Sequence, residues 1–107
     1  MIRTLSGRIT QHLSDGIVVD VGGVGYLVNV PARSTPQLGD EINCYIYHHI
    51  REDSQALYGF STMEELHIFQ QLLTVPSIGP KLAMVIMSVA TPADVVLAVE
   101  SDNVAFF

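Results

Sequence analysis

The strongest constraint on the fold is a change of hydrophobic period near residue 60. Upstream of it, apolar and polar residues alternate in short runs; Tyr26, Val28 and Val30, for example, fall on one face of a strand. Downstream, apolar residues recur every three or four positions, as they do in an amphipathic helix. A chain of 107 residues fits one domain, or one small domain and part of another. The sequence therefore predicts a β region over residues 1–60 and a helical region over residues 61–107.

Five short strands are predicted in the β region. Clusters of glycine and proline separate them, notably the turn Gly22-Gly23-Val24-Gly25 and the loop from Pro31 to Asp40. The glycine run is no dinucleotide-binding loop, because an alternating strand and not a helix follows it. Five strands of this length favour a small closed barrel, with an OB-fold as the leading candidate. The predicted strands are Thr4–Gln11, Gly16–Val21, Tyr26–Val30, Glu41–His48 and Gln55–Phe60.

Helical periodicity begins after Ser61. We interpret Ser61 to Glu64 as a capping box that starts a first helix. A second helix is predicted over Pro80–Val89, and a third is capped at Thr91 to Asp94 and runs through Glu100. The positions expected to follow the helical period on the first helix are Met63, Leu66, Phe69 or Gln70, and Leu73.

The stretch from Leu72 to Ile86 is the main candidate binding site. It predicts the end of one helix, a tight turn at Pro76-Ser77-Ile78-Gly79 and a new helix from Pro80. The backbone N–H groups at a helix N-terminus and the helix dipole together suit a phosphate. The alternative is a plain αα-hairpin that binds nothing. The N–H groups expected to point out of the new helix are those of Lys81, Leu82 and Ala83.

The charge balance limits the extent of any nucleic-acid surface. Five basic and eleven acidic residues give a formal net charge of −6, whereas nucleic-acid-binding proteins usually carry a basic footprint. Either a DNA-binding surface on this chain is small and local, or the acidic side has a role of its own.

Other kinds of site are disfavoured. Cys44 is the only cysteine, so there is no disulfide framework, and it lies too far from His48 along one strand for a nucleophile–base pair. The neighbours His48 and His49 face opposite sides of a strand, and Glu64 and His67 lack the second copy that a di-iron site needs. We predict no catalytic residue, no metal and no cofactor. No run of 18 apolar residues suggests a membrane span.

Three motifs follow one another along the chain. They are GGVGY at residues 22–26, REDSQALYGF at residues 51–60 and IGPKLA at residues 78–83. In this order, over a barrel and a helix-hairpin-helix, they closely resemble the RuvA family, the Holliday-junction-binding subunits of the bacterial branch-migration machinery. The resemblance covers essentially the whole chain.

The resemblance implies a non-catalytic, cytoplasmic bacterial subunit that acts in DNA recombination, DNA repair and the SOS response. It would bind four-way junction DNA through sequence-independent backbone contacts, as a homotetramer or as an octamer of two tetramers. Its partners would be the RuvB ATPase and the RuvC resolvase. The implied acidic pin, a pair of carboxylates at the centre of the tetramer, is Glu52 and Asp53. The implied DNA-backbone-binding residues are Ser77, Ile78, Gly79, Lys81, Leu82 and Ala83.

Two departures from the family matter. Ser77 stands where the hairpin motif normally has glycine, and these 107 residues contain neither a second hairpin nor a RuvB-binding C-terminal domain. The apolar, uncapped end at Phe106-Phe107 also suggests an N-terminal portion of a longer chain. We therefore expect residues 1–60 to form the barrel with its pin loop, and residues 61–107 to form the first part of the helical domain without motor recruitment.

A plain OB-fold module for single strands or for proteins is the competing class. Such a module stacks bases on aromatic side chains of the barrel face. The candidates near the barrel are Tyr26, Tyr45, Tyr47, Tyr58 and Phe60.

Overall fold

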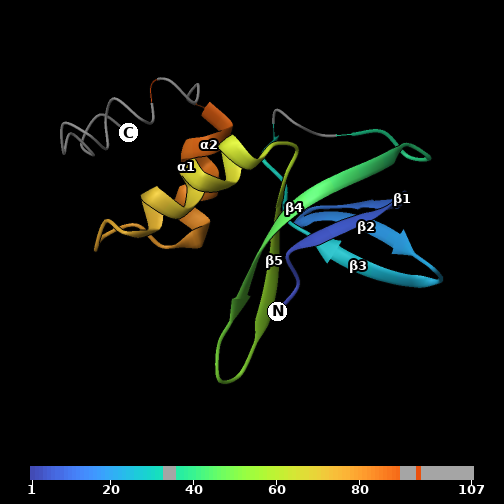
Figure 1. The fold of residues 1–107 in the computed structure, drawn as a ribbon, viewed down its shortest axis with the longest axis horizontal. Coiled ribbons are helices and arrows are strands. Elements are labelled where there is room, and N and C mark those ends of the chain that lie inside the picture. Colours follow the sequence, from blue (N-terminus) through green and yellow to red (C-terminus); the bar gives the residue numbers. More distant parts are fainter. Residues whose placement is uncertain (33–35, 90–93, 95–107) are drawn as a thin grey trace.

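The computed structural model describes residues 1–32, 36–89 and 94. A curled antiparallel sheet of five strands precedes two helices, which confirms the predicted order of β and α elements (Figure 1). The predicted third helix lies almost entirely outside the described residues. The elements are β1 (Thr4–Leu13), β2 (Gly16–Val21), β3 (Val24–Val28), β4 (Glu41–Ile50), β5 (Gln55–Phe60), α1 (Met63–Leu73) and α2 (Pro80–Val89).

The sheet curls until its two edge strands meet. Its strand order is β3-β2-β1-β4-β5, and a register shift between Ile9 and Gln11 in β1 marks an irregularity of the kind that bends a strand. Just beyond β3, the Asn29 N–H donates to the carbonyl of Leu57, and the Gly59 N–H donates to the carbonyl of Asn29, both at 2.8 Å. This single parallel bridge confirms an OB-like architecture. In the described residues the five strands form a curled half-barrel, and this bridge is the place where its two edges pair.

Four strand boundaries differ from the prediction, and one of them is the end of β3, which lies at Val28 and not at Val30. β1 continues to Leu13 and β4 to Ile50. Both strands belong to hairpins whose backbone pairing extends beyond the residues in which apolar and polar side chains alternate. β3 begins at Val24, since the turn consists of Gly22 and Gly23 alone, with φ of 61° and 93°. Two consecutive left-handed residues make the tight turn that matches the twist of a β-hairpin, and glycine adopts that conformation without strain.

β4 and β5 form a wall shared by two hydrophobic cores. Alternate side chains of this hairpin point into the barrel, among them Cys44, Ile46 and Leu57. The intervening side chains point toward the helices, where Tyr58 and Phe60 are buried. The helical core also contains Leu66, Ile68, Phe69, Leu72, Ile78, Ala83, Ile86 and Met87.

The start of α1 corrects two predictions. The cap is Thr62, one residue later than expected: its Oγ1 accepts the N–H of Glu65 at 3.1 Å, and the carboxylate of Glu65 accepts the hydroxyl of Ser61 at 2.7 Å. Met63 in the first turn is 43% exposed and does not belong to the core. The buried face of α1 consists of the predicted Leu66 and Phe69 together with Ile68 and Leu72, which we did not predict.

Candidate nucleic-acid interface

The turn between the helices follows the prediction closely. α1 ends at Leu73, and the N–H of Ile78 donates to the carbonyl of Val75 at 3.0 Å, which closes the turn over Pro76 and Ser77. The side chain of Ile78 is buried in the helical core and anchors the turn from below. α2 then begins at Pro80 as predicted.

Gly79 occupies the N-cap position of α2. Its carbonyl accepts the N–H of Ala83 at 3.0 Å, which is the first hydrogen bond of the helix. The expectation that the Ala83 N–H points outward is therefore wrong, and the Ala83 side chain is fully buried. The backbone N–H groups of Gly79, Lys81 and Leu82 precede this first bond. They therefore have no carbonyl acceptor within the helix.

The surface around these donors is open. Ser77, Gly79 and Lys81 are exposed, and Leu82 is 46% exposed. Gly79 does not adopt a left-handed conformation, and a Cβ built on it would meet nothing within 4 Å. Nothing inside the chain requires glycine at this position, so the absence of a side chain leaves room for an outside partner to approach the backbone.

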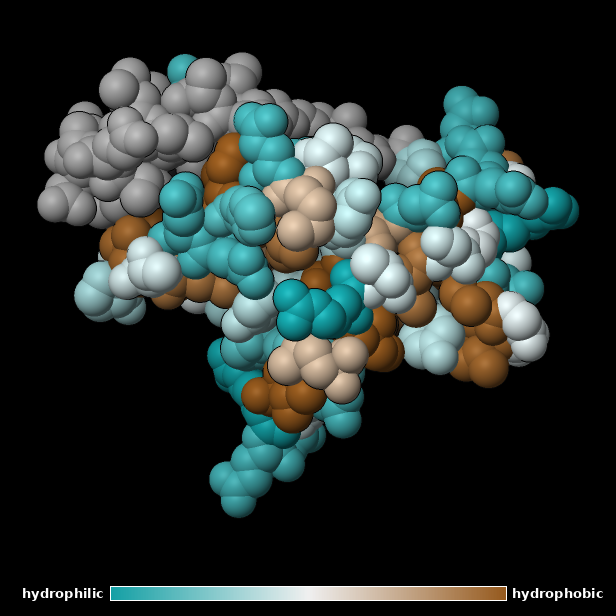
Figure 2. Space-filling model, in the orientation of Figure 1, coloured by the Kyte–Doolittle hydropathy of each residue, from teal (hydrophilic) through white to brown (hydrophobic). Residues whose placement is uncertain are grey.

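Glu52 and Asp53 occupy the tip of the long β4–β5 hairpin. The N–H of Arg51 donates to the carbonyl of Ser54 at 2.8 Å, which closes the turn and places the two acidic residues at its centre. The hairpin projects away from the helices, and its tip forms a hydrophilic protrusion (Figures 1 and 2). Both residues are exposed, and neither forms an ion pair with any described residue.

Arg51, next to the acidic pair, is turned back along the strand. Its Nε donates to Nε2 of His49 at 2.9 Å, and the His49 ring stacks on Tyr47 with centroids 6.0 Å apart. Tyr47 in turn meets the edge of Phe69 on α1 at 5.5 Å. We did not anticipate this role for His49. The signal was present in the alternation of a strand, which places residues 47, 49 and 51 on the same face.

His48 points to the opposite side of β4 from His49, as predicted. Its Nδ1 accepts the N–H of Ile2 at 3.0 Å, and its Nε2 bonds the side-chain carbonyl of Gln55 at 2.8 Å. Within residues 1–32, 36–89 and 94, no group of three or more potential ligands could hold a metal ion. In the same part of the chain, no helix has the length and apolar character needed to cross a bilayer.

The aromatic residues do not form an open stacking surface. Tyr58 and Phe60 are buried against α1, and Tyr45 and Tyr47 are partly buried beside them. Tyr26 packs against the barrel core on the other side of the wall. Because bases stack on exposed aromatic faces, this arrangement disfavours a plain single-strand-binding OB-fold.

Comparison with known proteins agrees with these features. The family described as the RuvA N terminal domain matches residues 1–59. The Holliday junction branch migration complex subunit RuvA of Tropheryma whipplei is 41% identical over 104 residues, which cover 96% of this chain and 54% of the relative. The protein of the same name from Syntrophobacter fumaroxidans is 46% identical over 97 residues, covering 88% of this chain and 49% of the relative. The chain thus spans about half the length of the curated relatives that it matches. With a family match over 59 of its 107 residues, the chain belongs to the RuvA family.

Proposed function

We propose that this chain is the junction-binding portion of a non-catalytic bacterial protein that binds four-way DNA during branch migration in recombination and repair. The observation that carries the proposal is the open N-terminus of α2, where a Cβ built on Gly79 would meet no other atom within 4 Å. The relatives bear the name of a Holliday junction branch migration complex subunit, which supports the choice of DNA.

In this proposal a DNA phosphate binds at the start of α2. The backbone donors at Gly79, Lys81 and Leu82 lack helical partners, and the positive end of the helix dipole lies behind them. The exposed side chain of Lys81 adds a full positive charge. Because backbone N–H groups and lysine contact phosphates and not base edges, binding would be independent of sequence. Ser77 and Ile78 would shape the turn, and Ala83 would support it from the core.

The acidic pair would act by repulsion at the crossover of the junction. Glu52 and Asp53 form no ion pair with described residues, so folding gives no evident reason for two adjacent negative charges. At physiological salt the repulsion between such charges and DNA reaches only about 8 Å. The pair would then exclude phosphates only at close range, which favours an open junction over a continuous duplex.

The assembly and its setting belong to the same proposal. Residues 1–60 would form the barrel and pin loop, and residues 61–107 would begin the helical domain. Four copies would bring their pins together at the centre of a tetramer, and two tetramers would enclose the DNA as an octamer. Only one face of that assembly needs to be positive, which is compatible with a net charge of −6. RuvB and RuvC would be the partners of the whole protein in the cytoplasm.

The test compares the affinities of the chain for a four-way junction, a duplex and a single strand at two salt concentrations. We expect the junction to bind most tightly. The double variant Glu52→Gln/Asp53→Asn should bind both junction and duplex more tightly, lower the junction-to-duplex preference and melt at an unchanged temperature.

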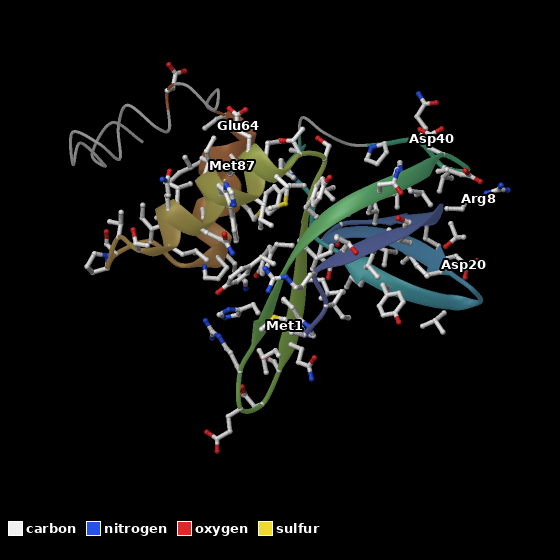
Figure 3. All side chains as sticks on the ribbon, in the orientation of Figure 1. Met1, Arg8, Asp20, Asp40, Glu64 and Met87 are labelled. Carbon is white, nitrogen blue, oxygen red and sulfur yellow. The ribbon has the colours of Figure 1, made fainter. Side chains whose placement is uncertain are left out.

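A matched control, Asp20→Asn/Glu64→Gln, removes the same charge at two places away from the hairpin tip (Figure 3). It should leave the junction-to-duplex preference unchanged. A preference for single strands would favour the plain OB-fold module instead. A pin variant with an unaltered preference would show that Glu52 and Asp53 are an ordinary solvated turn.

A further inference from the structure

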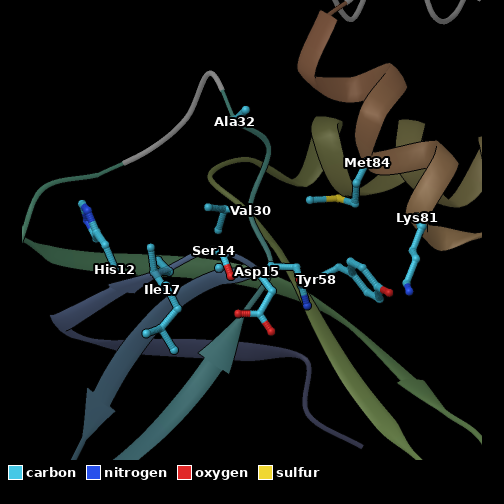
Figure 4. A pocket seen from close by; sticks show the side chains of 12 residues that line it. His12, Ser14, Asp15, Ile17, Val30, Ala32, Tyr58, Lys81 and Met84 are labelled. Carbon is cyan, nitrogen blue, oxygen red and sulfur yellow. The ribbon is translucent and has the colours of Figure 1, made fainter.

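A groove of about 530 Å³ runs along the seam between the barrel and α2. Its walls come from the β1–β2 turn, the segment after β3, β5 and the first turn of α2 (Figure 4). Three titratable side chains other than tyrosine line it, namely His12, Asp15 and Lys81. Lys81 thus lines both this groove and the proposed phosphate site.

Tyr58 places a hydroxyl in this groove. Its side chain belongs to the helical core and is only 7% exposed, with its ring centroid 5.5 Å from that of Phe69 and 6.5 Å from that of Tyr47. The ring is therefore fixed. Figure 4 shows its hydroxyl pointing toward the end of the groove at which the Lys81 side chain lies.

The Tyr58 hydroxyl has no hydrogen-bond partner among the described residues. No side-chain nitrogen or oxygen that is itself buried lacks a partner in the described residues, so this hydroxyl reaches the surface of the groove, where a partner from outside can accept its hydrogen bond. The side chain of Lys81 likewise forms no ion pair in the described part of the chain. A fixed neutral donor and an unpaired cation thus line the same groove.

The electrostatic surroundings keep this hydroxyl protonated. Burial raises the pKa of Tyr58, and the nearby Arg51 guanidinium offsets part of that rise. At neutral pH the group is accordingly a donor and not a phenolate. A hydroxyl donor and the Lys81 cation in one groove suit an anion, whereas Asp15 farther along the groove opposes one there.

We propose that the hydroxyl of Tyr58 donates a hydrogen bond to a backbone phosphate of duplex DNA, in a composite site with Lys81. The barrel and the helical hairpin then hold the same strand from both sides of the seam, which fixes the angle at which the duplex leaves the protein. This inference rests on the proposed function and adds a DNA contact on the barrel side.

The test is Tyr58→Phe, which removes one oxygen and keeps the buried ring. Because the hydroxyl has no partner within the chain, the melting temperature should stay the same or rise slightly. Affinity for duplex and for four-way junction should fall about tenfold, the usual cost of losing a hydrogen bond to a charged group. Tyr26→Phe removes the same atom from the other side of the sheet and should change neither affinity nor melting temperature.

The salt dependence separates the two members of the site. Tyr58→Phe should leave the slope of log affinity against log salt unchanged, since a hydroxyl releases no counterion. Lys81→Gln should lower that slope by about one. The two substitutions combined should cost less than the sum of the single losses if both side chains contact one phosphate.

The outcomes for the inference and for the proposed function are distinct. Wild-type affinity retained by Tyr58→Phe, with DNA binding by the wild-type chain intact, would overturn the inference and leave the proposed function standing. Failure of the wild-type chain to bind any DNA would overturn both.

Discussion

The Nε atom of Arg51 donates a hydrogen bond to Nε2 of His49 at 2.9 Å, so the cation beside the acidic pair is held by the strand and not by its acidic neighbours. Glu52 and Asp53 at the hairpin tip form no ion pair with Arg51 or with any other described residue. The His49 ring that accepts this bond stacks on Tyr47, and Tyr47 contacts α1 through Phe69. The charge pattern at the tip is thus coupled to the helical core by a row of side chains on one face of β4.

We predict that His49→Phe weakens the discrimination between junction and duplex. Phenylalanine keeps the stacking on Tyr47 but cannot accept the Arg51 hydrogen bond, so the guanidinium becomes free to neutralise Glu52 or Asp53. The junction-to-duplex affinity ratio should fall by about threefold, the scale of an exposed ion pair. His67→Phe on the exposed face of α1 is the control. A ratio that stays at the wild-type value would show that the Arg51–His49 bond has no effect on binding.

We predict that Gly79→Asn separates folding from binding. Asparagine is a good N-cap residue, and its side chain has open space at this position. Its carbonyl oxygen would accept the N–H of Lys81 or Leu82, which removes a donor from the phosphate. The melting temperature should be maintained or raised, while affinity for every DNA should fall about tenfold.

Gly22→Asn provides the matched comparison for that variant. Gly22 has φ of 61°, which asparagine tolerates, and a Cβ there meets nothing within 4 Å. This variant should bind DNA as the wild type does. Equal DNA affinity for Gly79→Asn and Gly22→Asn would remove the start of α2 from the binding surface.

We predict that Lys81→Glu weakens binding to all DNA sequences alike. Reversal of the charge beside a phosphate should lower affinity roughly tenfold and reduce the salt dependence, because fewer counterions are released. Arg8→Glu is the control, since Arg8 pairs with Glu41 at 3.3 Å at the far end of the barrel. Binding measured on several unrelated duplexes decides the matter: a loss confined to one sequence would contradict a backbone contact.

We predict that Cys44 makes the fold sensitive to alkaline pH. Burial raises the pKa of the Cys44 thiol, so the folded chain holds this proton more tightly than the unfolded chain. The resulting stability is complete below the unfolded pKa of about 8.5 and is lost as the pH rises through the higher folded value. Urea unfolding from pH 7 upward should therefore show a steeper loss of stability for the wild type than for Cys44→Ala. The same dependence of stability on pH in the wild type and in Cys44→Ala would contradict this role of the Cys44 thiol.

The sequence by itself determined the local features. Gly22 and Gly23 required a tight turn, Pro80 required the start of a helix, and the change of period near residue 60 required a sheet before the helices. Each of these patterns acts within a few residues, so it can be read without knowing the rest of the fold. The boundaries were less certain, as the cap at Thr62 and the continued pairing of β1 and β4 illustrate.

Only the tertiary structure decided which distant groups meet. The bridge from Asn29 to β5, the burial of the Tyr58 ring in the helical core and the place of Tyr58 in the groove beside Lys81 all depend on how far the sheet curls. That curl is the sum of twist, register shift and packing over the whole sheet, so no short stretch encodes it. For the same reason, the Tyr58 hydroxyl could be recognised as unpaired only after every neighbouring element was in place.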